Sequence, residues 1–462
     1  MNILQNKRLI ELEPNHKVPK TSLLLRNTLR ISIPAALETF FIGLIGMADT
    51  IMVGNFDEKA LAAVAICQQP VMITLAASVG INAGIIAIIS RRKGENKTIE
   101  ANKTLRQALI LGAVISLILT VLAYIFARPL LLFAGAQSDT IDYAMTYFRI
   151  VSSVLFFNYM RLAICSAQRA IGKTKITLVT NLAANIINII LNYLLISGHY
   201  GFPRLGVAGA AYATIVGNFI AFVIAFISIY KRKGFLSIRF HDEWKPDTDE
   251  VKHIFGVSSG AFIEQLFMRI GFFLIAMIVN NLGTEATAIN AIISTIMGIS
   301  FNITDGFAVG ASALVGQSLG EKDRVKAFAY GRISQILSVF LATSMMIITV
   351  TFRKELSNAF TDNKSIVDEA ARLLVYTCII MLPQSVQWVT TGVLRGSGDT
   401  HYTARSALIS VVFIRPSLSY ILCYPLALGI IGSWAGMFVD QSLRWFLNSR
   451  RFSSLKWMEI KI

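Results

Sequence analysis

The sequence has little charge and lacks the residue groupings that carry most enzyme chemistry. Only 15% of its 462 residues are Asp, Glu, Lys or Arg, whereas a soluble globular domain has about 25%. The five histidines fall in expected tails, loops or helix ends, without metal-ligand spacing or a nucleophile–base arrangement. A glycine-rich phosphate loop is also missing, which argues against an ATP-driven pump. We therefore expect neither an enzyme nor a resident cofactor.

Cysteine is scarce as well. The four cysteines lie in or near apolar stretches at unrelated spacings: Cys67, Cys165, Cys378 and Cys423. This pattern indicates small apolar residues rather than disulfides or metal ligands. Residues 1–28 are polar and basic and lack the apolar core of a cleavable signal peptide, so we expect the first span to act as its own insertion signal.

Long apolar stretches are what the sequence does contain. Hydrophobic residues make up 54% of the chain, the mean hydropathy is +0.60, and each apolar stretch can cross a membrane core of about 30 Å. The sequence predicts an all-α integral membrane protein with twelve spans: 29–53, 61–91, 104–127, 139–166, 175–197, 205–231, 252–281, 286–318, 327–351, 366–393, 402–424 and 427–449.

Basic residues are concentrated in alternate loops, including 91–93, 231–233 and 450–451. This distribution follows the positive-inside rule and predicts that both termini lie in the cytoplasm, in a multi-pass protein of the cell (plasma or inner) membrane. It also accounts for the formal net charge of +16 without a nucleic-acid partner.

An internal repeat divides the chain into two halves. Residues 31–97 recur at 257–323 with a constant offset of 226, and the same offset relates Arg169 to Arg395. Six spans per half make the repeat parallel, an organisation typical of secondary transporters whose site lies between the halves. We expect five segments: a tail at 1–28, an N-lobe at 29–231, a cytoplasmic linker at 232–250, a C-lobe at 251–449 and a tail at 450–462.

Acidic residues within the spans are the main candidates for function, because a charge in the bilayer costs several kcal/mol on most scales. They are Glu38, Asp49, Glu264 and Asp305. Glu38 and Asp49 share a helix face, about 16 Å apart. Structural alternatives remain: Asp49 can cap a helix or meet headgroups, Glu38 can hydrogen-bond near the kink at Pro34, and Asp305 can satisfy backbone in a broken helix.

Polar neighbours are available for Asp49. Asn188 and Asn192 are four residues apart and share a helix face, and Thr214 lies in the next span. Together with Asp49 these oxygens can form a cage for Na⁺, or the group can bind a proton on Asp49. The alternative is that the asparagines and the threonine only join helices.

Several basic residues also fall within or beside spans. Asp440 and Arg444, four residues apart, are interpreted as a structural ion pair. Arg169 and Arg395 stand at loop edges, where long side chains usually extend to the membrane surface. Three further arginines are placed within spans: Arg161, Arg269 and Arg415. Arg269 follows Glu264 by five residues, an imperfect spacing for a pair on one helix.

The chain resembles the multidrug and toxic compound extrusion (MATE) family. The resemblance rests on Pro34 with residues 47–54, and on residues 60–64, 315–320 and 392–400. It implies two six-helix lobes around a central cavity (the MOP-type fold) in a monomer surrounded by membrane lipid. It also implies export of cationic or amphipathic drugs in exchange for H⁺ or Na⁺ by alternating access.

The resemblance also implies roles for particular residues. Asp49, Asn188 and Thr214 match the family's N-lobe coupling site, and Asn192 occupies a position that is aspartate in one branch. Glu264 matches the helix-7 glutamate of the NorM-like branch.

The C-lobe departs from that branch. Gln384 stands where the helix-10 aspartate partner of the glutamate is expected, whereas Asp305 to Ala308 resembles the DinF-like branch, so the branch stays open. We hypothesise that Asp49 couples the ion. The residues expected to attract the substrate or a second cation are Glu264, Asp305, Glu38 and Gln384.

Two other functions remain as alternatives. A lipid-linked precursor flippase would need a strongly basic cavity, whereas acids dominate our candidate set. An ion channel would need a filter-like loop, which the sequence does not show.

Overall fold

The structure is a computed structural model that describes residues 9, 19–54, 58–138, 140–230, 234–239, 244–361, 363–460 and 462. Side chains at 47–51, 54, 58, 59 and 61 lie outside this description. Asp49, the predicted coupling residue, is therefore placed on its helix by its backbone alone.

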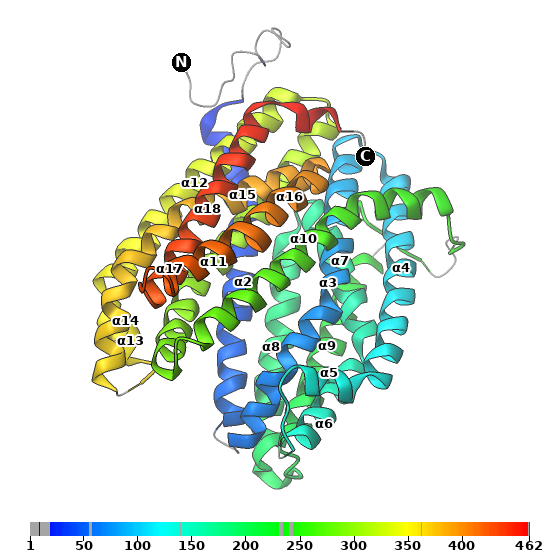
Figure 1. The fold of residues 1–462 in the computed structure, drawn as a ribbon. Helices are drawn as coiled ribbons and strands as arrows, with labels where there is room; N and C mark the ends of the chain where they lie inside the picture. The colour runs from blue at the N-terminus through cyan, green and yellow to red at the C-terminus, as the bar shows by residue number, and fades with distance from the viewer. Residues whose placement is uncertain are drawn as a thin grey trace. The chain divides into compact units, whose positions relative to one another are not determined.

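The described chain is helical, without a strand (Figure 1). The first half contains α2 (Thr21–Gly54), α3 (Glu58–Gly94), α4 (Thr98–Ile125), α5 (Ala127–Phe133), α6 (Ile141–Ser152), α7 (Leu155–Ala170), α8 (Thr174–Ser197), η1 (His199–Gly201) and α9 (Val207–Tyr230). The second half contains α10 (Thr248–Asn280), α11 (Thr284–Gly320), α12 (Arg324–Thr351), α13 (Arg353–Asn358), α14 (Lys364–Thr377), η2 (Cys378–Ile380), α15 (Met381–Ser397), α16 (Thr400–Ala407), η3 (Leu408–Ile414), α17 (Arg415–Cys423), α18 (Ile430–Ser453) and η4 (Lys456–Glu459).

Each predicted span coincides with a helix or a run of helices. Among the described residues, nine helical stretches are long and apolar enough to cross a membrane, and a tenth is the pair α6 and α7, bent by 50°. The other two predicted spans correspond to 364–397 and 430–453, which carry buried polar residues such as Gln384 and Asp440. The prediction of an all-α multi-pass membrane protein is confirmed.

The helices form two compact units, which we call the N-unit (Leu37–Ser258) and the C-unit (Met1–Ala36 with Ser259–Ile462). The beginning of α2 therefore packs in the C-unit, and the beginning of α10 packs in the N-unit. Gly310 lies directly against Ser32 in the C-unit, and Gly84 lies directly against Ser258 in the N-unit. The offset of 226 relates Ser32 to Ser258 and Gly84 to Gly310, so both copies of the repeat preserve the same exchanged contact.

Small residues bring α11 and α15 close together in the C-unit. A Cβ atom on Gly392 would lie 2.8 Å from the carbonyl carbon of Ala308, and one on Gly396 would meet the backbone of Ser312. Small residues four apart on facing helices are typical of tight packing in membranes. This contact holds in place the helix that carries Gln384 and Trp388.

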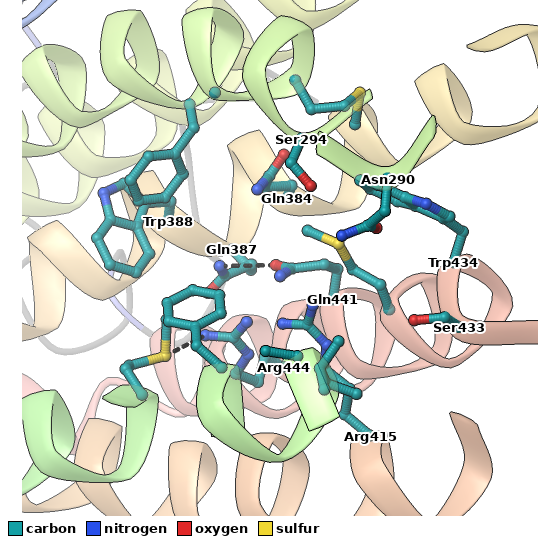
Figure 2. A pocket seen from close by; sticks show the side chains of 18 residues that line it. Asn290, Ser294, Gln384, Gln387, Trp388, Arg415, Ser433, Trp434, Gln441 and Arg444 are labelled. Atoms are coloured by element: carbon teal, nitrogen blue, oxygen red, sulfur yellow. Dashed lines mark hydrogen bonds between the residues drawn. The ribbon is translucent and has the colours of Figure 1, made fainter. Parts of the chain in front are cut away.

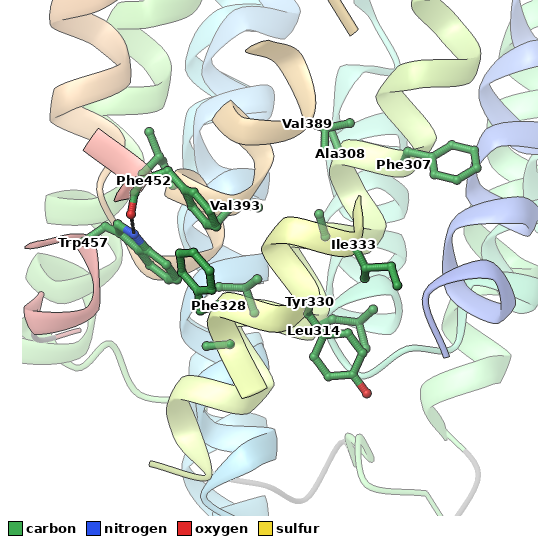
Figure 3. Packing of buried hydrophobic residues seen from close by; sticks show 14 of the residues in the cluster. Phe307, Ala308, Leu314, Phe328, Tyr330, Ile333, Val389, Val393, Phe452 and Trp457 are labelled. Carbon is green, nitrogen blue, oxygen red and sulfur yellow. Dashed lines mark hydrogen bonds between the residues drawn. The ribbon is translucent and has the colours of Figure 1, made fainter. Parts of the chain in front are cut away.

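The C-terminal segment packs into the C-unit core (Figure 3). Trp457 is fully buried, its ring lies 5.5 Å from that of Phe452, and its indole nitrogen donates to the Phe452 carbonyl at 2.8 Å. Phe452 in turn stacks on Phe328 at 4.8 Å. The described part of the segment predicted as a tail is thus part of the fold.

The described parts of the linker are tied to the N-unit. Arg92 and Glu250 form an ion pair at 2.7 Å, and Asn102 accepts a hydrogen bond from the Ser237 amide at 2.8 Å. Gln107 donates to the Lys245 carbonyl at 2.8 Å. These bonds hold the start of α10 against α3 and the linker against α4.

Candidate functional site

Three of the four predicted coupling residues lie together in the N-unit. Asn192 donates to the Asn188 side-chain oxygen at 3.2 Å, and Asn188 donates to the Thr214 hydroxyl at 3.3 Å. They lie on α8 and α9, which run side by side (Figure 1). The close approach depends on Gly217, where a Cβ would come within 2.9 Å of the Ala184 carbonyl oxygen. Asp49, the fourth, lies outside the described side chains.

Glu38 lies in a separate polar cluster of the N-unit. Its side chain is 1% exposed and forms an ion pair with Arg169. Thr177 donates to the same carboxylate at 2.6 Å, and Asn181 donates at 2.5 Å. Arg169, which was expected to extend toward the membrane surface, instead neutralises a buried acid.

The C-unit repeats this arrangement around Glu264. Its carboxylate is 2% exposed, lies 2.9 Å from the Arg395 guanidinium, and accepts from Thr403 at 2.7 Å. The offset of 226 relates each member to Glu38, Arg169 and Thr177 in turn. Arg395, like Arg169, was expected at the membrane surface and instead pairs with a buried glutamate. The offset shared by the acid, the arginine and the threonine is the sequence signal that could have indicated this pairing.

Trp388 connects the remaining predicted residues of the C-unit. Its indole nitrogen donates to Asp305 at 2.8 Å, and the Arg395 guanidinium lies 5.1 Å from its ring centre. Gln384 is one turn earlier on α15. Trp388 therefore bonds to Asp305 directly and is linked to Glu264 only through Arg395. The bonds described include no direct contact between the two acids.

A cavity of about 310 Å³ opens beside Trp388 (Figure 2). Its apolar wall includes Met268, Phe272, Met297, Phe301 and Trp434. Its polar wall includes Asn290, Ser294, Gln384, Gln387, Arg415, Ser433, Gln441 and Arg444. A cavity in which polar groups converge beside an apolar and aromatic wall is typical of a small-molecule site. Of the predicted site residues, Gln384 lines this cavity. Arg415 and Arg444 also line the cavity, which the sequence did not indicate.

The predicted ion pair between Asp440 and Arg444 is present and buried. Arg444 donates to Asp440 at 3.0 and 3.1 Å, and Ser410 donates to the same carboxylate at 2.5 Å. Gln441 donates to it as well, at 3.3 Å. Arg444 is therefore held rigidly at the cavity wall with its charge compensated.

Comparison with known proteins assigns the family. The family model MatE matches residues 34–194 and 261–421. The chain belongs to the MatE family. The two matches fall one in each copy of the repeat and include Glu38, Asn188 and Asn192 in the first and Glu264 and Arg415 in the second.

Relatives and solved structures agree with the MatE assignment. The chain is 26% identical to the probable multidrug resistance protein NorM of Thermotoga maritima, over 96% of this chain and 95% of that one. It is 25% identical to the uncharacterized transporter YisQ of Bacillus subtilis, over 92% of this chain and 93% of that one.

Solved structures have the same fold. An outward-facing multidrug resistance MATE family transporter of the MOP superfamily gives a TM-score of 0.87 at 21% identity, with coverage of 96% of this chain and 100% of that one. A Pyrococcus furiosus MOP superfamily transporter, described as having a binding pocket of reverse polarity, gives 0.86 at 21% identity, with coverage of 96% and 100%. The predicted family and fold are confirmed, and the chain is a MatE family transporter.

Proposed function

We propose that this transporter is a secondary active multidrug exporter of the cell membrane, working by alternating access in exchange for H⁺ or Na⁺. The observation that carries the proposal is the cavity of about 310 Å³ with a wall of methionine and aromatic side chains inside a membrane-spanning bundle. Flexible thioethers and aromatic faces suit amphipathic compounds of varied shape. The multidrug name of the Thermotoga maritima relative supports the same substrate class.

The N-unit supplies the proposed coupling site. Asn188, Asn192 and Thr214 present oxygen atoms within one hydrogen-bonded group, and oxygen ligands suit small hard cations. We propose that Asp49 completes this group and binds H⁺ or Na⁺. One ion entering across about 100 mV yields roughly 2.3 kcal/mol per charge, and a monovalent cation leaving costs the same amount. The concentration gradient of the coupling ion therefore drives a one-for-one exchange. The protein then needs no resident cofactor, and we expect a monomer with both termini in the cytoplasm.

Cationic drugs are the substrates that the family resemblance predicts. The acids expected to attract them, Glu38 and Glu264, are each paired with an arginine. Their role toward a cation therefore requires that the arginine release the carboxylate.

Gradient-driven efflux tests the proposal. Ethidium release from vesicles containing the protein should follow an imposed ΔpH or ΔNa⁺. Asp49→Asn should abolish this response at unchanged expression, and Asn192→Leu, which copies the Leu418 found at the repeat position, should weaken it. Undiminished efflux in Asp49→Asn would remove Asp49 from the mechanism, and no response of the wild type to either gradient would contradict the exporter proposal.

A second candidate is a lipid-linked precursor flippase, which the two arginines at the cavity favour. Its pyrophosphate would need more positive charge than this wall offers, because Asp440 compensates Arg444. Gradient-independent movement of a lipid pyrophosphate by the purified protein would support it.

A further inference from the structure

The charge of the C-unit cavity is positive. Arg415 and Arg444 both line it, and none of its lining residues is acidic. Figure 2 shows both arginine side chains at the same end of the pocket, beside the Gln387–Gln441 hydrogen bond. A site built for organic cations would be expected to present the opposite charge.

The two arginines differ in their partners. Arg444 is bound at two nitrogens by Asp440, which cancels its charge locally. Arg415 is 6% exposed, its Nε has no hydrogen-bond partner, and no described carboxylate forms an ion pair with it. Its guanidinium lies 5.5 Å from the Phe272 ring centre, and it interacts electrostatically with Asp440 and Arg444 without bonding to either. Two guanidinium groups thus share one carboxylate, which leaves one net positive charge at the wall.

The local backbone explains how Arg415 reaches the cavity. It follows the π-helical segment η3 and precedes Pro416, which has no backbone N–H to donate. A π segment adds a residue to the turn and so rotates later side chains by about 100° around the axis; such segments are frequent at functional sites. Ser410, within η3, is bonded to Asp440, so the segment is fixed to the helix that carries Arg444.

A buried charge without a counterion is costly, since water cannot solvate it there. Arg cannot relieve the cost by losing its proton. Its planar fork instead matches the two oxygens of a carboxylate, sulfonate or phosphate. Gln384 adds a neutral donor on the same wall: it is 7% exposed, lines the cavity and has no described hydrogen-bond partner.

We propose that this cavity binds one oxyanion group through Arg415, with the attached apolar body against Trp388, Trp434 and Phe272. Resting on the exporter function proposed above, this inference adds amphipathic organic anions or zwitterions to the substrates. A free organic acid and a lipid phosphate share this chemistry, and the test below separates them.

Equilibrium binding without any gradient provides the test. Naphthalene-2-sulfonate and 2-naphthylmethylammonium have similar apolar bodies and opposite charges, and dihexanoyl phosphatidate represents the lipid source. Titration of the purified full-length protein, followed by quenching of tryptophan emission and by calorimetry, should show saturable sulfonate binding that is tighter than ammonium binding. A preference for phosphatidate over the sulfonate would assign the oxyanion to lipid.

Substitutions identify the residue responsible. Arg415→Gln should weaken sulfonate binding by about ten-fold or more, because a charge-assisted hydrogen bond is worth about 1.5–3 kcal/mol. Arg415→Lys should give an intermediate affinity, since the charge stays but the fork is lost. Arg405→Gln, an exposed arginine of α16, is the matched control and should leave the affinity unchanged.

A variant that adds charge covers the case in which Arg415→Gln does not fold. Gln387→Glu places a carboxylate of nearly the same shape at the cavity wall, and should weaken sulfonate binding and strengthen ammonium binding. Equal or tighter binding of the ammonium by the wild type would overturn the inference. So would a folded Arg415→Gln variant whose sulfonate affinity stays within about two-fold of wild type.

The outcome separates this inference from the exporter proposal. Gradient-driven ethidium efflux without Arg415-dependent sulfonate binding would leave the exporter and remove the anion site. Arg415-dependent binding with no gradient-driven efflux of either probe would leave the anion site and remove the exporter.

Discussion

Replacing Glu264 with glutamine should leave the Arg395 guanidinium, whose side chain is only 16% exposed, without its carboxylate. Glu264 is 2% exposed and lies 2.9 Å from Arg395, while Arg395 is also held over the Trp388 ring. Removing one partner of a buried ion pair costs about 3–5 kcal/mol, because the remaining charge stays desolvated. We therefore expect Glu264→Gln to reduce the free energy of unfolding by that amount.

A double-mutant cycle in detergent micelles measures the effect. Arg395→Leu should be destabilising to a similar degree, and the double variant should recover at least about 2 kcal/mol relative to the sum of the single losses. Thr403→Val removes only the neutral donor at 2.7 Å and should cost about 1.5–3 kcal/mol. Denaturant titration followed by circular dichroism gives all four values.

The competing hypothesis is that Glu264 chiefly binds a cation during transport. Glu264→Gln would then keep the wild-type unfolding free energy and lose the response of efflux to ΔNa⁺ or ΔpH. That result would refute the reasoning from the ion pair. A large loss of stability, with coupling restored in the stable double variant, would instead assign Glu264 to the architecture of the C-unit.

Two further predictions concern a helix contact in the C-unit and a linker contact in the N-unit. Gly392→Ala would place a carbon 2.8 Å from the Ala308 carbonyl carbon, whereas carbon atoms in contact are about 3.5 Å apart. Because α11 and α15 must then separate, the melting temperature should fall, with a loss of about 1–3 kcal/mol in the free energy of unfolding. The control Gly256→Ala, where the added Cβ meets nothing within 4 Å, should be neutral or stabilising, and an equal loss in both variants would contradict the packing argument. The Lys103 side chain lowers the pKa of Asp247 below its usual value, so the stabilisation from Asp247 is complete above about pH 4 and disappears as the pH falls through the lowered pKa. Between about pH 6 and pH 3 the wild type should therefore lose more stability than Asp247→Asn, and parallel losses would show that Asp247 contributes nothing.

The sequence was sufficient for most of the fold because hydropathy and the repeat act over long stretches. Twelve apolar blocks predict where the helices lie, and the constant offset of 226 predicts which residues of the two repeat copies correspond. The packing of the C-terminal segment could not be predicted in this way. Trp457 is buried by rings from Phe452 and Phe328, and composition alone does not indicate which aromatic residues will meet.

The N-unit part of the candidate site was more accessible to sequence reasoning than the C-unit cavity. Asn188 and Asn192 share a helix face by spacing alone, and their bond follows. Arg415 enters the cavity after a π segment, and that rotation breaks the periodicity on which a helix-face prediction depends. The contacts of Trp388 likewise require tertiary structure, since Asp305 and Phe301 reach it from α11.

The two copies of the repeat keep the same supports and differ in the groups they present. Each copy retains a buried glutamate with its arginine and threonine, and each retains the exchanged contact between a serine and a glycine. At the repeat positions of Asn188 and Asn192 the second copy has Ile414 and Leu418, whereas Arg415 corresponds to Ile189 in the first copy. The N-unit therefore offers amide and hydroxyl oxygens, which suit a cation, and the C-unit offers a guanidinium, which suits an anion. Because the two halves present opposite chemistry, a coupling cation and an oxyanion-bearing substrate would bind to different residues. Coupling between the cation and the substrate must then act through the conformation of the helices rather than through competition for one site.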